Sequence, residues 1–128
     1  MNLEFGRLYI DTNEELPVIE RYAGNMYLYR YDLRLEESVE EDETNLKRYS
    51  FVEVRLQGYP NRNETIKNLI HQLVSSDDEM KLNNDYNEVM NFEDNPKETD
   101  AYKEYMKYLN FRKEIRTKVN VDFDNSGY

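Results

Sequence analysis

The stretch from Arg48 to Val74, RYSFVEVRLQGYPNRNETIKNLIHQLV, decides the fold class. In its first part apolar and polar residues alternate, which is typical of a strand with one buried face. A Gly-Tyr-Pro sequence then ends the strand, and Asn61 followed by Glu64 is the pattern of a capped helix start. After this start, apolar residues recur every three or four positions. The stretch therefore predicts a strand over residues 48–57 and a helix from residue 61.

Strand patterns also occupy most of the chain before this stretch. Residues 3–10 are apolar enough for a strand, although the alternation changes phase at Gly6, where we expect a bulge or a bend. Residues 16–22 and 26–35 flank a short Ala-Gly-Asn segment, and the second of them alternates cleanly, which is typical of a β-hairpin. The sequence therefore predicts a strand-rich region over residues 3–57.

The second half of the chain is predicted to be helical. A second helix is expected over residues 77–90, because Ser76 can cap it and acidic residues follow at the positive end of the helix dipole. Residues 91–97 are expected to form a loop, and a third helix is expected over residues 99–119, where apolar residues again recur at helical spacing.

Together these elements predict an α+β fold, in which an N-terminal antiparallel sheet packs against two or three C-terminal helices. The length of 128 residues suits one domain. We expect this domain over residues 1–119, with its strand-rich part at 3–57 and its helical part at 61–119. Residues 120–128 are expected to form a C-terminal tail.

The segment from Glu36 to Glu43 contains six carboxylates in eight residues. Because like charges at this density repel one another, we expect the segment to be a mobile, solvated loop between two strands. An acidic docking segment or a calcium site is the functional alternative. Calcium requires carboxylates around a tight turn, and this segment lacks the glycine that such a turn uses.

The composition excludes several classes of function. The chain has a formal net charge of −10, which disfavours direct nucleic-acid binding because phosphate neutralisation needs a basic surface. It contains no cysteine, which excludes disulfides and thiolate chemistry. No apolar run reaches the roughly 18 residues of a membrane span, so no membrane partner is expected.

The candidates for catalysis and metal binding are weak. His71 is the only histidine, and it lies off the apolar face of its helix, which is typical of a surface residue. Residues 122–127 match the start of a calcium-binding loop but lack its bidentate glutamate. Asp32 and Glu53 resemble a nuclease carboxylate pair, but Arg55 replaces the usual lysine and favours a salt bridge. We therefore expect no enzyme activity, no cofactor and no metal site.

Two groups of side chains are candidates for a protein interface. The first lies on the predicted strand 26–35, where alternating tyrosines accompany two arginines; the tyrosines could stack on bases or sugars, form a hot spot, or belong to the core. The second lies on the predicted third helix, since residues 97–118 carry a charge of +3 whereas residues 1–96 carry −11. The candidate interface residues are Tyr27, Tyr29, Tyr31, Arg30, Arg34, Lys107, Arg112 and Arg116.

Several motifs in the second half of the chain occur in a recognisable order. VEVRLQGYPN at residues 52–61 is followed by SDDE at 76–79, LNNDY at 82–86 and the tyrosine-rich AYKEYMKYLNFRK at 101–113. With these motifs, residues 50–119 resemble a C-terminal module of small proteins from phages and prophages of Bacteroides-like gut bacteria. No N-terminal counterpart is identified.

The resemblance implies a non-enzymatic structural or interaction protein of a bacteriophage particle, such as a head- or tail-fibre-associated or other minor virion subunit. It implies a virion location after assembly in the host cytoplasm, with other phage structural proteins and copies of the same chain as partners. The alternative is an intracellular tail-fibre assembly chaperone that is absent from the mature particle.

Overall fold

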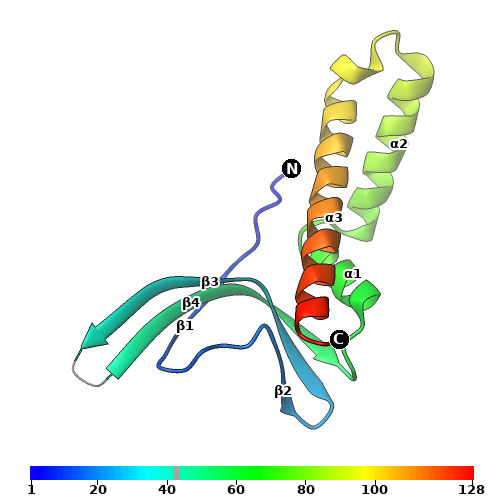
Figure 1. Ribbon diagram of the computed structural model, residues 1–128. Coiled ribbons are helices and arrows are strands. Elements are labelled where there is room, and N and C mark those ends of the chain that lie inside the picture. The colour runs from blue at the N-terminus through cyan, green and yellow to red at the C-terminus, as the bar shows by residue number, and fades with distance from the viewer. Residues whose placement is uncertain (42–43) are drawn as a thin grey trace.

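The computed structural model describes residues 1–41 and 44–128, and it confirms the predicted α+β class (Figure 1). Four strands form one antiparallel sheet in the order β1-β4-β3-β2. The strands are β1 (Leu8–Thr12), β2 (Ile19–Ala23), β3 (Met26–Glu41) and β4 (Thr44–Gln57). The helices are α1 (Arg62–Leu73), α2 (Ser76–Phe92) and α3 (Asp100–Asn125), with a short 3-10 helix, η1 (Pro96–Glu98), before α3.

The predicted β2–β3 hairpin is confirmed. Ala23 pairs with Met26, and Gly24 between them adopts a φ of +53°, which glycine takes without steric cost. The predicted strand over residues 3–10 is only partly correct, because pairing starts at Leu8. The segment before Leu8 has no partner strand and instead packs Leu3 and Phe5 against the core.

The prediction of a loop over residues 36–43 is wrong for the described part of that segment. β3 continues to Glu41 and pairs with β4 as far as Thr44; residues 42 and 43 lie outside the described residues. The pairing places Glu37 opposite Arg48, and such opposite charges stabilise a ladder. Glu36 and Glu37 are exposed, so they keep their hydration while the backbone forms the sheet.

The main core lies between one face of the sheet and helices α1 and α3. On the sheet, Tyr29 pairs with Val54 and Tyr31 with Val52, so these side chains share the face that the helices cover. The helices contribute apolar residues at helical spacing: Ile66, Leu69 and Ile70 from α1, and Phe111, Ile115, Val119 and Phe123 from α3. These contacts fix the two helices on the sheet.

The expected tail from residue 120 is also wrong, since α3 continues to Asn125. Phe123 lies four residues after Val119 on the same helical face and is fully buried. The helix ends in a Schellman-type arrangement, with Gly127 at a φ of +80° and the Tyr128 amide donating to the Phe123 carbonyl at 2.8 Å. The last residues therefore complete the core.

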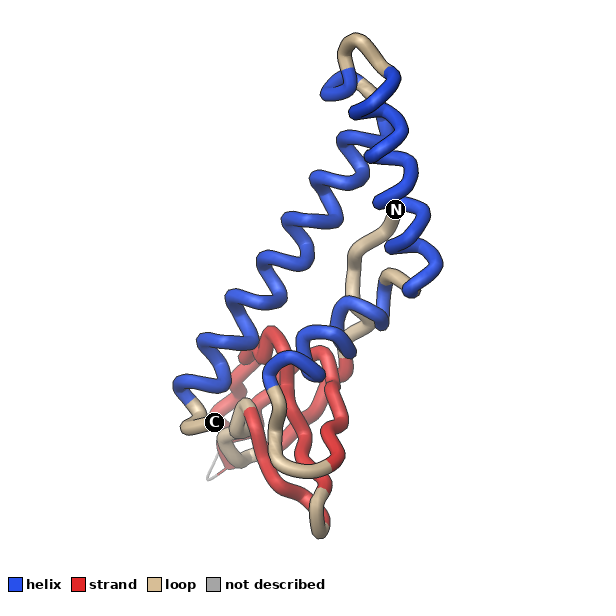
Figure 2. Tube along the Cα trace, turned by 90° about the vertical axis from the view of Figure 1, so that its right-hand side faces the viewer, coloured by secondary structure: helices blue, strands red, loops and turns tan. Residues whose placement is uncertain are grey.

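Helix α2 and the first half of α3 form a helical hairpin that extends beyond the sheet (Figure 2). No residue of α2 is fully buried. Tyr86 of α2 stacks on Tyr105 of α3 with ring centroids 4.2 Å apart, and this aromatic contact joins the two helices.

Among the described residues, no helix is long and apolar enough to cross a membrane.

At the other end of the molecule, β3 and β4 continue past the helices as a curved ribbon (Figure 1). We call residues 34–41 and 44–50 the arm. β1 pairs with β4 only as far as Lys47, so the end of the arm is two-stranded. Register shifts after Tyr31 and after Leu35 each insert one extra residue into β3, and such bulges bend and twist a ribbon.

Candidate functional site

The predicted tyrosine surface is not available in this fold. Tyr29 is fully buried, and its hydroxyl donates to Asp122 Oδ2 at 2.6 Å. Burial first, and then the Asp122 carboxylate, raise the pKa of Tyr29 far above its ordinary value. Tyr27 and Tyr31 are half-buried against the same core. The prediction of an exposed interface is therefore wrong for Tyr29, because Asp122 and Phe123 in the unexpected last turns of α3 contact it.

Arg30 lies on the opposite face of the sheet and is also buried. It donates to the Pro17 carbonyl at 2.7 Å, forms an ion pair with Glu20, and lies 5.3 Å from the centroid of the Phe51 ring. These contacts tie β3 to β2 and to the segment before it. Arg30 is thus a structural residue and is removed from the candidate interface.

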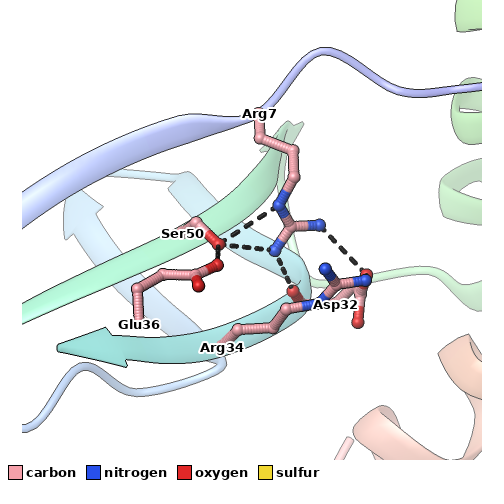
Figure 3. Close-up of polar contacts among 5 residues, drawn as sticks. All are labelled: Arg7, Asp32, Arg34, Glu36 and Ser50. Atoms are coloured by element: carbon pink, nitrogen blue, oxygen red, sulfur yellow. Dashed lines mark hydrogen bonds and ion pairs between the residues drawn. The ribbon is translucent and has the colours of Figure 1, made fainter.

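Arg34 belongs to a polar network where the arm leaves the helical layer (Figure 3). Arg7 contacts Asp32 twice, with nitrogen–oxygen distances of 3.0 Å to Oδ2 and 2.6 Å to the carbonyl, and Arg34 reaches the same Oδ2 at 2.6 Å. The buried Ser50 hydroxyl donates to Glu36 and accepts from Arg7. We call these five residues the collar.

The collar fixes the start of the arm. Asp32 adopts a φ of +54°, a left-handed conformation that aspartate tolerates better than most residues and that the first bulge of β3 requires. Because Arg7 donates to both the side chain and the carbonyl of Asp32, it holds this conformation from the neighbouring segment. The arm therefore projects in a direction set by long-range hydrogen bonds.

Asp32 and Glu53, considered for a nuclease site, form ion pairs with different arginines. Asp32 is held by Arg7 and Arg34, whereas Glu53 pairs with Arg55 at 2.8 Å. Within residues 1–41 and 44–128, no group of three potential ligands from His, Cys, Asp and Glu lies close enough to hold a metal ion. This arrangement is that of an ionic sheet surface.

The basic residues of α3 lie in two different places. Lys107 donates to the Met1 carbonyl at 2.8 Å, and the N-terminal amine lies 3.5 Å from Glu104. Lys107 therefore helps to attach the N-terminal segment to α3. Arg112 and Arg116 lie further along the helix and line a pocket at the junction of α1, α2 and α3.

The pocket has a volume of about 380 Å³ and is lined by Asn63, Ile66, Lys67, Ile70, His71, Ser76, Glu79, Arg112 and Arg116. We call it the basic pocket. His71 Nε2 lies 2.7 Å from Glu79 Oε1, and the Tyr108 hydroxyl donates to Glu79 Oε2. Burial alone would raise the pKa of Glu79, but the hydrogen bonds from Tyr108 and His71 outweigh it and lower that pKa below its ordinary value.

Lys67 and Glu79 are the pocket residues that the sequence did not reveal. The available signal is the spacing of the cations: Lys67 and His71 are four residues apart on α1, and Arg112 and Arg116 are four residues apart on α3. Such pairs share one face of a helix. The sequence does not show that the two faces meet.

Comparison of the chain with protein-family models, with curated proteins and with solved structures gave no match. The resemblance of residues 50–119 to a phage module therefore stays a prediction.

Proposed function

We propose that the protein is a non-enzymatic structural or interaction protein of a bacteriophage particle, and that the arm is the contact with neighbouring subunits. The observation that carries the proposal is exposed apolar surface on the arm. The exposed fractions are 54% for Leu35, 45% for Val39 and 48% for Leu46. None of these three residues belongs to the core cluster.

The arm is an unusual element for a chain that acts alone. β3 has 16 residues and β4 has 14, whereas strands in globular proteins average about 5–6 residues. A two-stranded ribbon without a packed face is marginally stable in water. Val39 pairs with Leu46, and alternation along β4 places this pair on the face opposite to Leu35. The arm thus presents apolar side chains on both faces.

A neighbouring subunit that covered the arm would stabilise it. Complete burial of these half-exposed side chains contributes roughly 1 kcal/mol each. The collar supports the same role, because it holds the arm in one direction before any partner is bound. A preformed projection loses less conformational entropy on binding than a flexible loop.

The positions of the titratable groups favour a non-enzymatic role. His71 and Tyr108 both hydrogen-bond Glu79, and Asp32 and Glu53 pair with arginines. Each of these groups has a structural partner that positions it. We infer that the protein binds partners and does not catalyse a reaction.

Mass spectrometry of purified phage particles and of the infected-cell lysate tests the proposal. A structural subunit is present in both samples at a fixed ratio to the major virion proteins. A protein found in the lysate but absent from particles is instead the assembly chaperone. Detection with neither phage particles nor phage assembly intermediates contradicts both forms of the proposal.

A matched pair of variants tests the role of the arm. Val39→Asp places a charge on the arm, whereas Val121→Asp makes the same change at an equally exposed position, 46%, on α3. We expect Val39→Asp to abolish incorporation into particles and Val121→Asp to preserve it. Equal incorporation of the two variants would show that the arm is not the contact.

A further inference from the structure

The basic pocket gathers positive charge in an otherwise acidic molecule. Lys67 comes from α1, and Arg112 and Arg116 come from α3. Ser76, the first residue of α2, also lines the pocket, so the positive end of the α2 dipole lies at its wall. The only carboxylate in the lining is Glu79.

These three cations have no carboxylate partner in the part of the chain that the structure describes. The contrast with the other arginines is clear, because six of them form ion pairs: Arg7, Arg30, Arg34, Arg48, Arg55 and Arg62. With 27 acidic residues in the chain, carboxylates are abundant. Of the nine arginines, Arg112 and Arg116 are thus two of the three, with Arg21, that form no ion pair among the described residues.

Glu79 forms no ion pair with the pocket cations, although the charge of Arg112 helps to lower the pKa of Glu79. One of its oxygens is bonded to His71 and the other to Tyr108. The Arg112 guanidinium lies 5.7 Å from the centroid of the Tyr108 ring, which orients it, and its Nε is buried without a hydrogen-bond acceptor. Arg112 is therefore oriented beside the pocket with at least one buried donor that lacks an acceptor.

We propose that the basic pocket binds an oxyanion, which is a carboxylate or a phosphate group presented by a ligand. Arginine forks match both groups in a bidentate manner, and Lys67 adds a point charge from the facing helix. The volume of about 380 Å³ is near the lower end of the roughly 300–1,000 Å³ range of ligand pockets, which suits a small anionic group better than a large cofactor.

The experiment is an NMR titration of the full chain with inorganic phosphate and, separately, with acetate. Chloride is exchanged for the added anion so that the ionic strength stays constant. We expect the side-chain Nε–H signals of Arg112 and Arg116 to shift and to saturate with at least one of the two anions. Saturation with phosphate alone identifies a tetrahedral dianion, and saturation with acetate identifies a carboxylate.

Matched variants separate the pocket from general charge effects. Lys67→Gln removes a pocket cation, and Lys113→Gln removes the same charge from an exposed position of α3 outside the pocket. We expect Lys67→Gln to weaken binding about five- to tenfold and Lys113→Gln to change it less than about twofold. Glu79→Gln keeps the size of the side chain and one acceptor oxygen, replaces the other oxygen by an amide donor and removes the negative charge, so binding should become tighter.

Two results would overturn the proposal. Shifts that rise linearly with both anions show that no site exists, and equal weakening by Lys67→Gln and Lys113→Gln shows that only net charge matters. Because the titration uses the isolated chain, its outcome is independent of whether the protein belongs to a phage particle. Failure of one proposal therefore leaves the other testable.

Discussion

Replacement of Tyr29 by alanine should unfold or nearly unfold the protein. Removal of a fully buried aromatic side chain costs about 3–5 kcal/mol. The same change leaves Asp122 without the phenol that donates to it at 2.6 Å, which adds roughly 1–3 kcal/mol, although Lys118 lies 3.3 Å from the other carboxylate oxygen. The combined loss approaches the total stability of about 5–15 kcal/mol for a domain.

Urea unfolding followed by circular dichroism measures this effect. Tyr29→Phe keeps the ring and removes only the hydroxyl, so it should lose about 1–2 kcal/mol and remain folded. Tyr9→Ala, at an exposed position, should stay within about 0.5 kcal/mol of the parent protein. A Tyr29→Ala protein with the same unfolding midpoint as Tyr9→Ala would refute the packing argument and restore Tyr29 to a surface role.

Three further predictions concern other parts of the structure. Deletion of residues 120–128 should abolish cooperative thermal unfolding, because it removes the buried Phe123; retention of the transition would mean that these residues are a tail after all. Burial and then the charge of Asp32 raise the pKa of Tyr31 to about 12, so its contribution to stability is complete below pH 10 and is lost between pH 10 and 12. Urea titrations across this pH range should show a smaller loss of unfolding free energy for Tyr31→Phe than for the parent protein. Arg7→Ala should accelerate hydrogen exchange in the arm more than in α1, as measured by mass spectrometry.

The local elements could be predicted from the sequence because their signals are local. The Asn61 side chain accepts from the Glu64 amide at 3.0 Å, as the capping pattern indicated. The hairpin at Gly24 likewise follows from turn chemistry within a few residues. The second helix begins one residue earlier than expected, since Ser75 and not Ser76 is the cap.

The incorrect predictions share a physical cause, which is that distant partners override local preference. The acidic part of β3 is extended because β4 supplies a paired strand, including Arg48 opposite Glu37. The final turns of α3 form because Phe123 and Asp122 meet Tyr29 in the core. Val119 and Phe123 are four residues apart, as on one face of a helix, but the polar residues around them made the segment resemble a tail.

The candidate sites also contain residues that a local pattern reveals and residues that only the fold brings together. Arg112 and Arg116 were identified from the basic segment, and the structure brings them to one pocket. Lys67 and Glu79 reach that pocket from other helices, which no pattern within α3 could indicate. The arm was missed because the density of carboxylates in residues 36–43 predicted a loop, whereas Val39 pairs with Leu46 in the sheet.

The accessibility of the arm in assembled particles shows whether the arm is the contact between neighbouring subunits. Since the chain contains no cysteine, Leu46→Cys introduces a single thiol on the arm, and Val121→Cys introduces one on α3 as a control. The rate of maleimide labelling is measured for each variant in the isolated protein and in purified particles. We expect rapid labelling of both isolated variants and protection of position 46 in particles. Labelling of position 46 at the same rate in both states would contradict this expectation.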